Sequence, residues 1–175
     1  MIRKIQEQEF DRVFALMEAS FPPDEHRPYE EQKALLSRAE YRIYVWEEAG
    51  EICGFAAVWA LGAFFFLEHL AVAEAVRNAG IGGKLLRAVC AGANNRVVLE
   101  VELPASELCR RRIGFYERCG FCSNEYDYTQ PPISKGKAPV PLRIMTYGSA
   151  VCEEEFRAIR DVLYSCVYQV KEKLE

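Results

Sequence analysis

A glycine-rich turn is the strongest chemical signal in this sequence. It follows a predicted strand and opens a predicted amphipathic helix, and it consists of Arg77, Asn78, Ala79, Gly80, Ile81, Gly82 and Gly83. Glycines let backbone N–H groups approach an anion closely, and the start of a helix adds unpaired donors and a positive dipole. The turn is therefore suited to cradle a pyrophosphate. A glycine-rich turn without a ligand is the alternative, and a Rossmann site is disfavoured because only Gly80 and Gly82 fit the start of its pattern.

Three carboxylates are candidates for acid–base or cation-binding roles. Glu68 interrupts an apolar strand, so it lies either in water at the end of a sheet or in a cleft that uses its charge. In a regular strand, His69 would point away from Glu68. Glu100 and Glu102 share one face of the next predicted strand, because side chains alternate with a period of two. A solvated strand face is the alternative for this second pair.

The elements that must position these residues follow from hydrophobic periodicity. Strands are predicted over residues 1–7, 41–47, 52–60, 64–72, 97–102, 121–128 and 140–147. Helices are predicted over residues 10–17, 28–36, 81–90, 104–118 and 156–170. This order predicts a mixed α/β fold with about seven mostly antiparallel strands and flanking helices. We expect one domain over residues 1–150, with a C-terminal helix, residues 151–175, packed on it.

Two motifs resemble those of a known family. Arg77-x-x-Gly80-x-Gly82 resembles the coenzyme A motif, Gln/Arg-x-x-Gly-x-Gly/Ala, of the GNAT superfamily of N-acetyltransferases. Further along, the segment 112–121 contains Phe-Tyr-Glu followed by Gly-Phe and is similar to the second signature of that family. The predicted order of elements is also similar, from Ile2 to about Tyr147. Many members carry an asparagine and an alanine where this chain has Cys109 and Arg112.

The resemblance implies acetyl-CoA as co-substrate, held by the glycine-rich turn and by the backbone of Leu70, Ala71 and Val72, where the strand is expected to bulge. It implies that the Leu70 N–H points at the thioester oxygen. It also implies that Tyr116 is the general acid for the coenzyme A thiolate; packing beside Phe115 is the alternative for this tyrosine. In some branches of the family, a glutamate at the place of Glu68 helps to deprotonate the amine through water.

The expected activity is acetyl transfer from acetyl-CoA to an amine, by direct attack, because no cysteine stands beside a base visible in the sequence. We expect a small cationic amine or a peptide amine as acceptor. Glu68 would lie closest to the reacting nitrogen, Glu100 or Glu102 would add negative potential, and Tyr29 would belong to the rim of the acceptor pocket. A non-catalytic coenzyme A-binding or sensory domain, and an interaction module built on the C-terminal helix, are the alternatives.

Charge, apolar runs and cysteine spacing indicate which classes of partner are disfavoured. The 175-residue chain has a net charge of −4, which disfavours a general nucleic-acid surface. Its apolar runs are shorter than a membrane span, so a cytoplasmic protein is expected. The Cys119-x-x-Cys122 spacing has no second pair, and the chain has only two histidines, so no metal is expected. A homodimer is left open.

Overall fold

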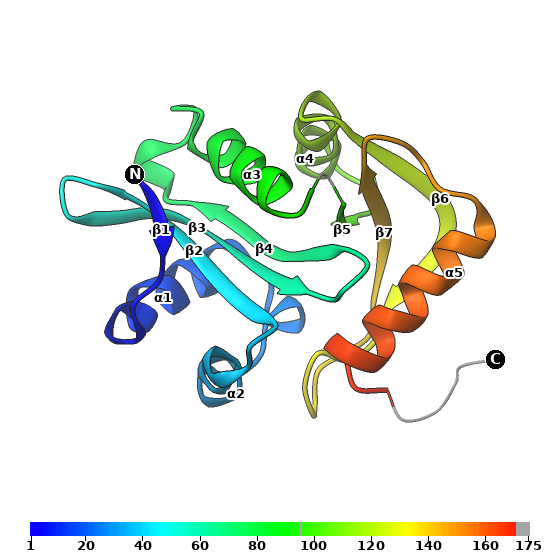
Figure 1. Ribbon diagram of the computed structural model, residues 1–175, viewed down its shortest axis with the longest axis horizontal. Helices are drawn as coiled ribbons and strands as arrows, with labels where there is room; N and C mark the ends of the chain where they lie inside the picture. Colours follow the sequence, from blue (N-terminus) through cyan, green and yellow to red (C-terminus); the bar gives the residue numbers. More distant parts are fainter. Residues whose placement is uncertain (95, 171–175) are drawn as a thin grey trace. The chain divides into compact units, whose positions relative to one another are not determined.

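The computed structural model describes residues 1–94 and 96–170 and forms two compact units, Met1–Val97 and Val98–Glu175. The prediction of a mixed α/β fold with seven mostly antiparallel strands and flanking helices is confirmed over the described residues (Figure 1). None of the helices in this part of the chain has the length and hydrophobicity that a membrane crossing requires.

The first unit carries four antiparallel strands, paired in chain order. They are β1 (Ile2–Lys4), β2 (Tyr41–Glu48), β3 (Glu51–Ala60) and β4 (Phe65–Val72). Its helices are α1 (Phe10–Ser20), α2 (Tyr29–Ala34) and α3 (Ile81–Gly92), with short 3-10 turns at Glu7–Glu9, Pro23–Glu25, Leu35–Ser37 and Glu74–Val76.

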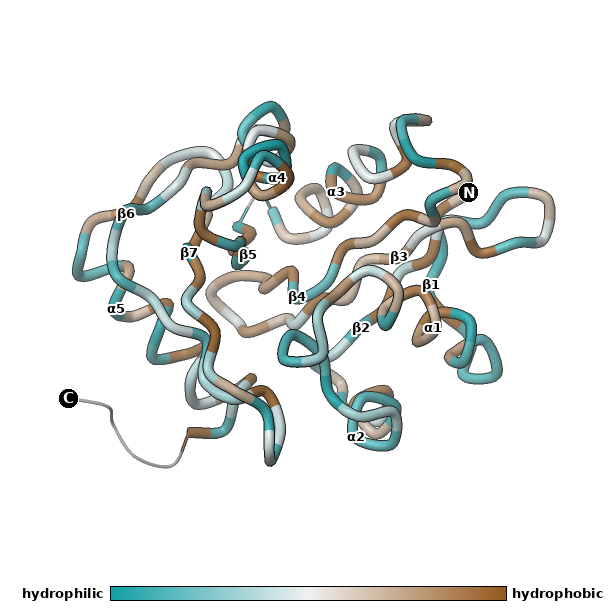
Figure 2. Tube along the Cα trace, turned by 180° about the vertical axis from the view of Figure 1, so that it is seen from behind, coloured by the Kyte–Doolittle hydropathy of each residue, from teal (hydrophilic) through white to brown (hydrophobic). Residues whose placement is uncertain are grey.

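Strand β3 forms the centre of this unit. Its residues from Gly54 to Trp59 are buried without interruption, and α1 and α3 lie on opposite sides of it (Figure 1). A strand covered on both faces needs a continuous apolar run instead of alternation, which explains the sequence Gly-Phe-Ala-Ala-Val-Trp. Figure 2 shows this run as a hydrophobic stretch of the trace. Helix α3 buries the stripe predicted from its periodicity: Ile81, Leu85, Leu86, Val89 and Cys90.

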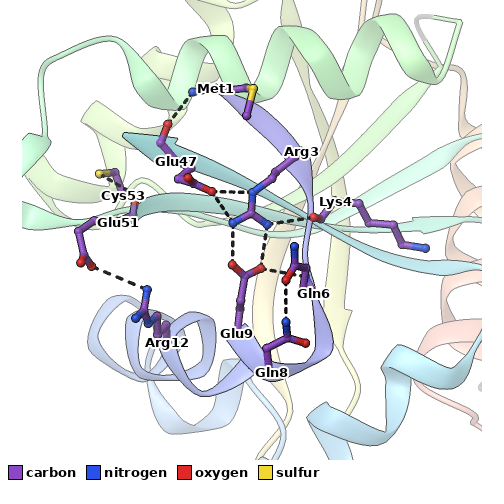
Figure 3. Close-up of polar contacts among 10 residues, drawn as sticks. All are labelled: Met1, Arg3, Lys4, Gln6, Gln8, Glu9, Arg12, Glu47, Glu51 and Cys53. Carbon is purple, nitrogen blue, oxygen red and sulfur yellow. Dashed lines mark hydrogen bonds and ion pairs between the residues drawn. The ribbon is translucent and has the colours of Figure 1, made fainter. Parts of the chain in front are cut away.

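Ion pairs hold the short edge strand β1 in place (Figure 3). The Arg3 guanidinium donates to Glu47 on β2, from Nε at 2.6 Å, and to both carboxylate oxygens of Glu9, at 2.6 and 2.8 Å. The Met1 ammonium donates to the Glu47 carbonyl oxygen at 2.6 Å. A three-residue strand makes few backbone hydrogen bonds, so these charged contacts add to the attachment of β1 to β2.

The second unit contains an antiparallel sheet in the order β5, β7, β6. Its elements are β5 (Val97–Glu102), α4 (Glu107–Arg118), β6 (Phe121–Gln130), β7 (Val140–Tyr147) and α5 (Glu153–Val162). The Ser106 hydroxyl accepts from the Cys109 N–H at 3.1 Å and caps α4, as Ser/Thr/Asp/Asn do at helix starts. Gly120, at φ +95°, follows the helix in the left-handed region that favours glycine.

The C-terminal helix packs on the second unit. The Phe156 ring lies 4.8 Å from that of Tyr126 and 6.3 Å from that of Tyr128, between ring centroids. The helix was expected to run to Val170, but α5 ends at Val162 and one π-helical turn, Leu163–Val167, follows it. The last part of the predicted 151–175 segment, residues 171–175, lies outside the described residues.

Candidate active site

The glycine-rich turn has the backbone that an anion cradle requires. Gly80 caps the start of α3 with φ +76° and ψ 8°, and Asn78 has φ +69°, two left-handed positions that suit glycine and asparagine. Among the described residues, no side chain caps α3, and its first turn holds no acidic residue. Because the first N–H groups of a helix have no partner within it, those of residues 81–83 are donors for a ligand. The residues fit a pyrophosphate.

Two cations accompany this turn. Arg77 Nε donates to the Val72 carbonyl oxygen at 3.4 Å and so reaches back to the end of β4. Lys84, in the first turn of α3, has its Nζ 5.0 Å from the centroid of the Trp46 ring. Sequence reasoning did not select Lys84, although a lysine instead of an acidic residue in a first helical turn was a usable signal, since the helix dipole favours acids there.

Strand β4 bulges earlier than expected. Ala57 pairs with His69 and Val58 pairs with Leu67, so Glu68 is the extra residue. Leu70, Ala71 and Val72, where the bulge was expected, pair in regular register with residues 54–56. A bulge disrupts the alternation of side chains, and His69 Nδ1 lies 3.6 Å from a Glu68 carboxylate oxygen instead of pointing away from it. The expectation of opposite faces was wrong for this pair.

Glu68 is neither solvated nor freely accessible. Its side chain is 2% exposed, and both of its carboxylate oxygens accept from the Arg27 guanidinium, at 2.9 and 3.1 Å. Burial alone would raise the pKa of Glu68, but the charge of Arg27, helped by His69, outweighs burial and lowers it. A carboxylate with a lowered pKa is a weaker proton acceptor, so this environment does not favour the role of general base.

Tyr116 lies in the second unit, on the buried face of α4. Its ring centroid is 5.2 Å from that of Phe115 and 5.9 Å from that of Phe121. Burial, opposed by the charge of Arg112, raises the pKa of Tyr116 to about 12. The hydroxyl therefore stays protonated at neutral pH, as a proton donor must, and the packing alternative is also met. The catalytic role of Tyr116 stays a prediction.

Glu100 and Glu102 are both engaged within the second unit. Glu102 accepts from Arg112 at 2.7 Å and from the Cys109 thiol at 2.9 Å. Cys109 and Arg112, the two departures from the family signature, thus contact one carboxylate. The sequence had shown no cysteine beside a base, because this contact depends on the packing of α4 on β5.

The Glu100 carboxylate accepts from tyrosine hydroxyls. Tyr168 donates to its two oxygens at 2.9 and 2.7 Å, and Tyr128 donates to one of them. Both carboxylates are thus hydrogen-bonded and neither is fully exposed, although the Glu102 side chain keeps 33% exposure to solvent. The contact of Glu100 and Glu102 with an acceptor stays a prediction.

Tyr29 packs α2 against α1. Its ring centroid lies 5.4 Å from that of Phe10 and 5.2 Å from that of Phe14, and its hydroxyl donates to Asp11. The Lys33 ammonium lies 3.4 Å from the hydroxyl oxygen. Tyr29 thus helps to fix the segment that precedes β2, and its place on the rim of an acceptor pocket stays a prediction.

Comparisons with known proteins agree with the fold. The acetyltransferase (GNAT) domain matches residues 39–123. A protein from Bacteroides thetaiotaomicron assigned to the GNAT acetyltransferase family is 33% identical, with a TM-score of 0.88 over 98% of this chain and 99% of that one. No curated protein matches the chain.

More distant structures share the fold alone. The ribosomal-protein-S18-alanine N-acetyltransferase of Escherichia coli is 16% identical, with a TM-score of 0.66 over 88% of this chain and 96% of that one. A mutant form of a spermidine N-acetyltransferase from Vibrio cholerae is 15% identical, with a TM-score of 0.61 over 84% of this chain and 94% of that one. Because the Bacteroides protein matches this chain at 33% identity along almost its whole length, the chain belongs to the GNAT family of acetyltransferases.

Proposed function

We propose that this protein transfers the acetyl group of acetyl-CoA to an amine. The observation that carries the proposal is the left-handed Gly80 at the start of α3, which leaves the first N–H groups of the helix as donors on the element that follows β4 and the short turn Glu74–Val76. Acetyl-CoA supplies the activated acetyl thioester. The backbone of residues 80–83 and the side chain of Arg77 bind the pyrophosphate, and the backbone of residues 70–72 binds the pantetheine arm.

Proton transfer falls to Tyr116. The leaving thiolate needs a proton, and a phenol whose pKa is raised to about 12 remains protonated over the working pH range of an enzyme. The amine attacks as the neutral free base, so the reaction needs no covalent acyl-enzyme. Cys109 does not change this proposal, because its thiol donates to the Glu102 carboxylate at 2.9 Å and is engaged within the second unit.

The contacts of Glu68, Glu100 and Glu102 bear on whether a cationic amine can bind at each carboxylate. Structural neighbours include a ribosomal-protein-S18-alanine N-acetyltransferase and a spermidine N-acetyltransferase, so a protein amine and a small cationic amine are both candidate acceptors. A cationic acceptor at Glu68 would compete with Arg27, and at Glu102 it would compete with Arg112. Glu100 accepts from the hydroxyls of Tyr128 and Tyr168. Its contact with a cationic acceptor stays part of the proposal, and Tyr168→Phe tests it.

A thiol-release screen with acetyl-CoA tests the function. The acceptors are spermidine, free amino acids, aminoglycosides and peptides with the N-terminal sequences of ribosomal proteins, and calorimetry measures acetyl-CoA binding separately. Binding together with amine-dependent thiol release supports the proposal. Binding without release with any amine would favour a non-catalytic coenzyme A-binding domain, and absence of binding would favour an interaction module.

The turn itself is tested by Gly82→Glu, with Gly92→Glu as control. Both variants add one negative charge to α3, but only Gly82 lies in the turn, whereas Gly92 is the last residue of the helix and has open space around it. We expect Gly82→Glu to abolish acetyl-CoA binding in a folded protein and Gly92→Glu to preserve it. Equal affinities in the two variants would exclude the turn as the pyrophosphate site.

A further inference from the structure

Three buried polar side chains meet at the bulge of β4. The side chains of Arg27, Glu68 and His69 are 6%, 2% and 2% exposed. Arg27 and Glu68 form a bidentate pair in which two guanidinium nitrogens meet two carboxylate oxygens, the geometry that fixes orientation as well as charge. Because Glu68 is the extra residue of the bulge, this pair occupies the irregular position in the pairing of β4 with β3.

The cluster ties a distant segment to β4. His69 Nε2 lies 2.7 Å from the Glu25 carbonyl oxygen, and a carbonyl only accepts, so Nε2 carries the proton. The His69 ring also meets the Phe21 ring edge-on, with centroids 4.7 Å apart. Together with Arg27, these contacts anchor the chain between α1 and α2 at several successive points.

Arg27 has a second set of partners that continues the network. Its backbone N–H and its guanidinium both donate to the Gln32 side-chain oxygen, at 3.3 and 3.4 Å. Gln32 in turn donates to the Tyr41 hydroxyl at 2.8 Å, and neither Gln32 nor Tyr41 is appreciably exposed. The network therefore runs from β4 through the segment 21–34 to the start of β2, and Arg27 is its centre.

A buried ion pair is a costly way to fasten a segment. Removing two charges from water costs about as much as their attraction returns, and well-packed apolar side chains often stabilise as well or better. What such a pair provides is a defined geometry: the segment 21–34 has one position in which both guanidinium bonds are made. Glu68, which accepts both bonds, stands two residues before Leu70, whose N–H is expected, from the family resemblance, to point at the thioester oxygen.

We propose that Arg27 is a positioning residue for the acetyl transfer, and that the Arg27–Glu68 pair fixes the segment 21–34 beside the acetyl group and so shapes the acceptor site. This inference rests on the proposed function. Glu68 then acts through Arg27 and not as the base, so removal of either partner has the same kinetic effect.

The test compares Arg27→Met and Glu68→Gln with Arg38→Met as a matched control. Arg38 also lies over the Trp59 ring, at 5.1 Å against 5.8 Å for Arg27, and also has a carboxylate partner, Glu40, but it is partly exposed. The acceptor is the amine with the highest kcat/KM in the thiol-release screen. We expect both pair variants to raise its KM by about tenfold or more, with acetyl-CoA affinity within about twofold and an unchanged pH profile. Arg38→Met should match the parent.

A different kinetic pattern would overturn the inference. If Glu68 were the base, Glu68→Gln would lower kcat/KM most strongly near neutral pH, recover at higher pH, and differ from Arg27→Met. An unchanged acceptor KM in folded Arg27→Met would also reject the positioning role. Should the single variants fail to fold, the double variant Arg27→Met/Glu68→Met removes both charges together, and it should fold with the same raised KM.

Hydrogen exchange provides a readout that needs no acceptor. In both single variants, or in the double variant where these do not fold, amide exchange over residues 21–34 should accelerate by about tenfold or more relative to the parent, while exchange in α3 stays the same. Unchanged exchange over that segment rejects the inference. If the parent binds acetyl-CoA but acetylates no amine in the screen, the proposed function fails, and the exchange experiment still decides whether the pair fixes the segment.

Discussion

Gly54 lies so close to Ala71 that a Cβ at Gly54 would stand 3.0 Å from the Ala71 carbonyl oxygen. The same Cβ would meet Leu85 at 3.3 Å and Ile81 at 3.4 Å, both on the buried stripe of α3. The missing side chain is therefore what lets α3 pack on β3 and β4. The glycine-rich turn is the start of α3. The distance between that turn and the sheet therefore depends on the absence of a side chain at Gly54.

We predict that Gly54→Val destabilises the protein by roughly 1–3 kcal/mol, the usual cost of overpacking, and weakens acetyl-CoA binding. Urea unfolding and calorimetry measure the two effects. Gly92→Ala is the control, because Gly92 ends the same helix with open space around it, and it should be neutral or slightly stabilising. A Gly54→Val protein with parental stability and affinity would show that α3 does not depend on this contact.

The sequence predicted those features that repeat along the chain or sit in one short segment. The stripe of α3 and the order of the strands are local or periodic, and the structure confirms them. The bulge at Glu68 was placed two residues too late, because a bulge depends on the register between β3 and β4. Register is set by packing across strands and leaves no mark within the strand itself.

The candidate site was less predictable for the same reason. Glu68 and Arg27 are 41 residues apart, and nothing in either local sequence indicates that they pair. The contact of Cys109 and Arg112 with Glu102 likewise requires α4 to be folded onto β5. Candidate carboxylates could be found from their types and positions, but their partners, and hence their basicity, belong to tertiary structure.

Tyr116→Phe should preserve acetyl-CoA affinity and lower kcat by roughly 100-fold, the scale of a lost general acid. The phenyl ring keeps the contacts with Phe115 and Phe121. Because the pKa of Tyr116 is raised to about 12, its hydroxyl stays protonated as the pH rises. The rate of the parent should therefore climb with pH as the amine loses its proton. Deprotonation of Tyr116 should not lower that rate before about pH 11.

Steady-state kinetics between pH 6 and about 10 measure both effects. Tyr147→Phe is the matched control, since Tyr147 also meets the Phe121 ring edge-on, with centroids 5.3 Å apart. Its kcat should stay near that of the parent. A kcat for Tyr116→Phe within about twofold of the parent, with chemistry rate-limiting, would leave Tyr116 as a packing residue.

The Arg3–Glu9 pair predicts a pH-dependent stability of the first unit. The hydrogen bond from Arg3, with that from the Gln6 N–H, lowers the pKa of Glu9 to about 2 from its ordinary 4.5. A lowered carboxyl pKa adds stability that is complete above the ordinary value and is lost as the pH falls towards the lowered one. Arg3→Met should therefore lower Tm most between pH 5 and 7, and the difference from the parent should shrink towards pH 2.

Thermal unfolding of both proteins across this range measures the effect. Arg157→Met is the control, because the Arg157–Glu153 pair on α5 is exposed, and such pairs contribute little. A Tm difference for Arg3→Met that is constant from pH 7 to pH 2 would contradict the assignment of the stabilising contact to the ionised Glu9.

Tyr168 predicts how strongly the C-terminal segment is fastened to β5. Its hydroxyl donates to both oxygens of Glu100, at 2.9 and 2.7 Å, and a hydrogen bond to a charged group contributes more than one between neutral groups. Tyr168→Phe should therefore reduce the free energy of unfolding by roughly 1.5–3 kcal/mol. Tyr164→Phe is the matched control, because the Tyr164 hydroxyl donates at 2.6 Å to a neutral acceptor, the Thr129 carbonyl oxygen. Its cost should be only about 0.5–1.5 kcal/mol.

The same pair of variants tests whether Glu100 meets the acceptor. Loss of the Tyr168 hydroxyl leaves Glu100 with fewer donors, so a cationic acceptor that contacts this carboxylate should bind more tightly in Tyr168→Phe. Raised salt should weaken that binding, because salt screens the charge of the carboxylate. Tyr164→Phe should leave the acceptor KM unchanged.

The measurements are urea unfolding and acceptor KM at low and high salt. Equal losses of stability in the two variants would show that Glu100 is not a specially strong acceptor of the Tyr168 hydroxyl. An acceptor KM that ignores both Tyr168→Phe and salt would place the acceptor away from Glu100.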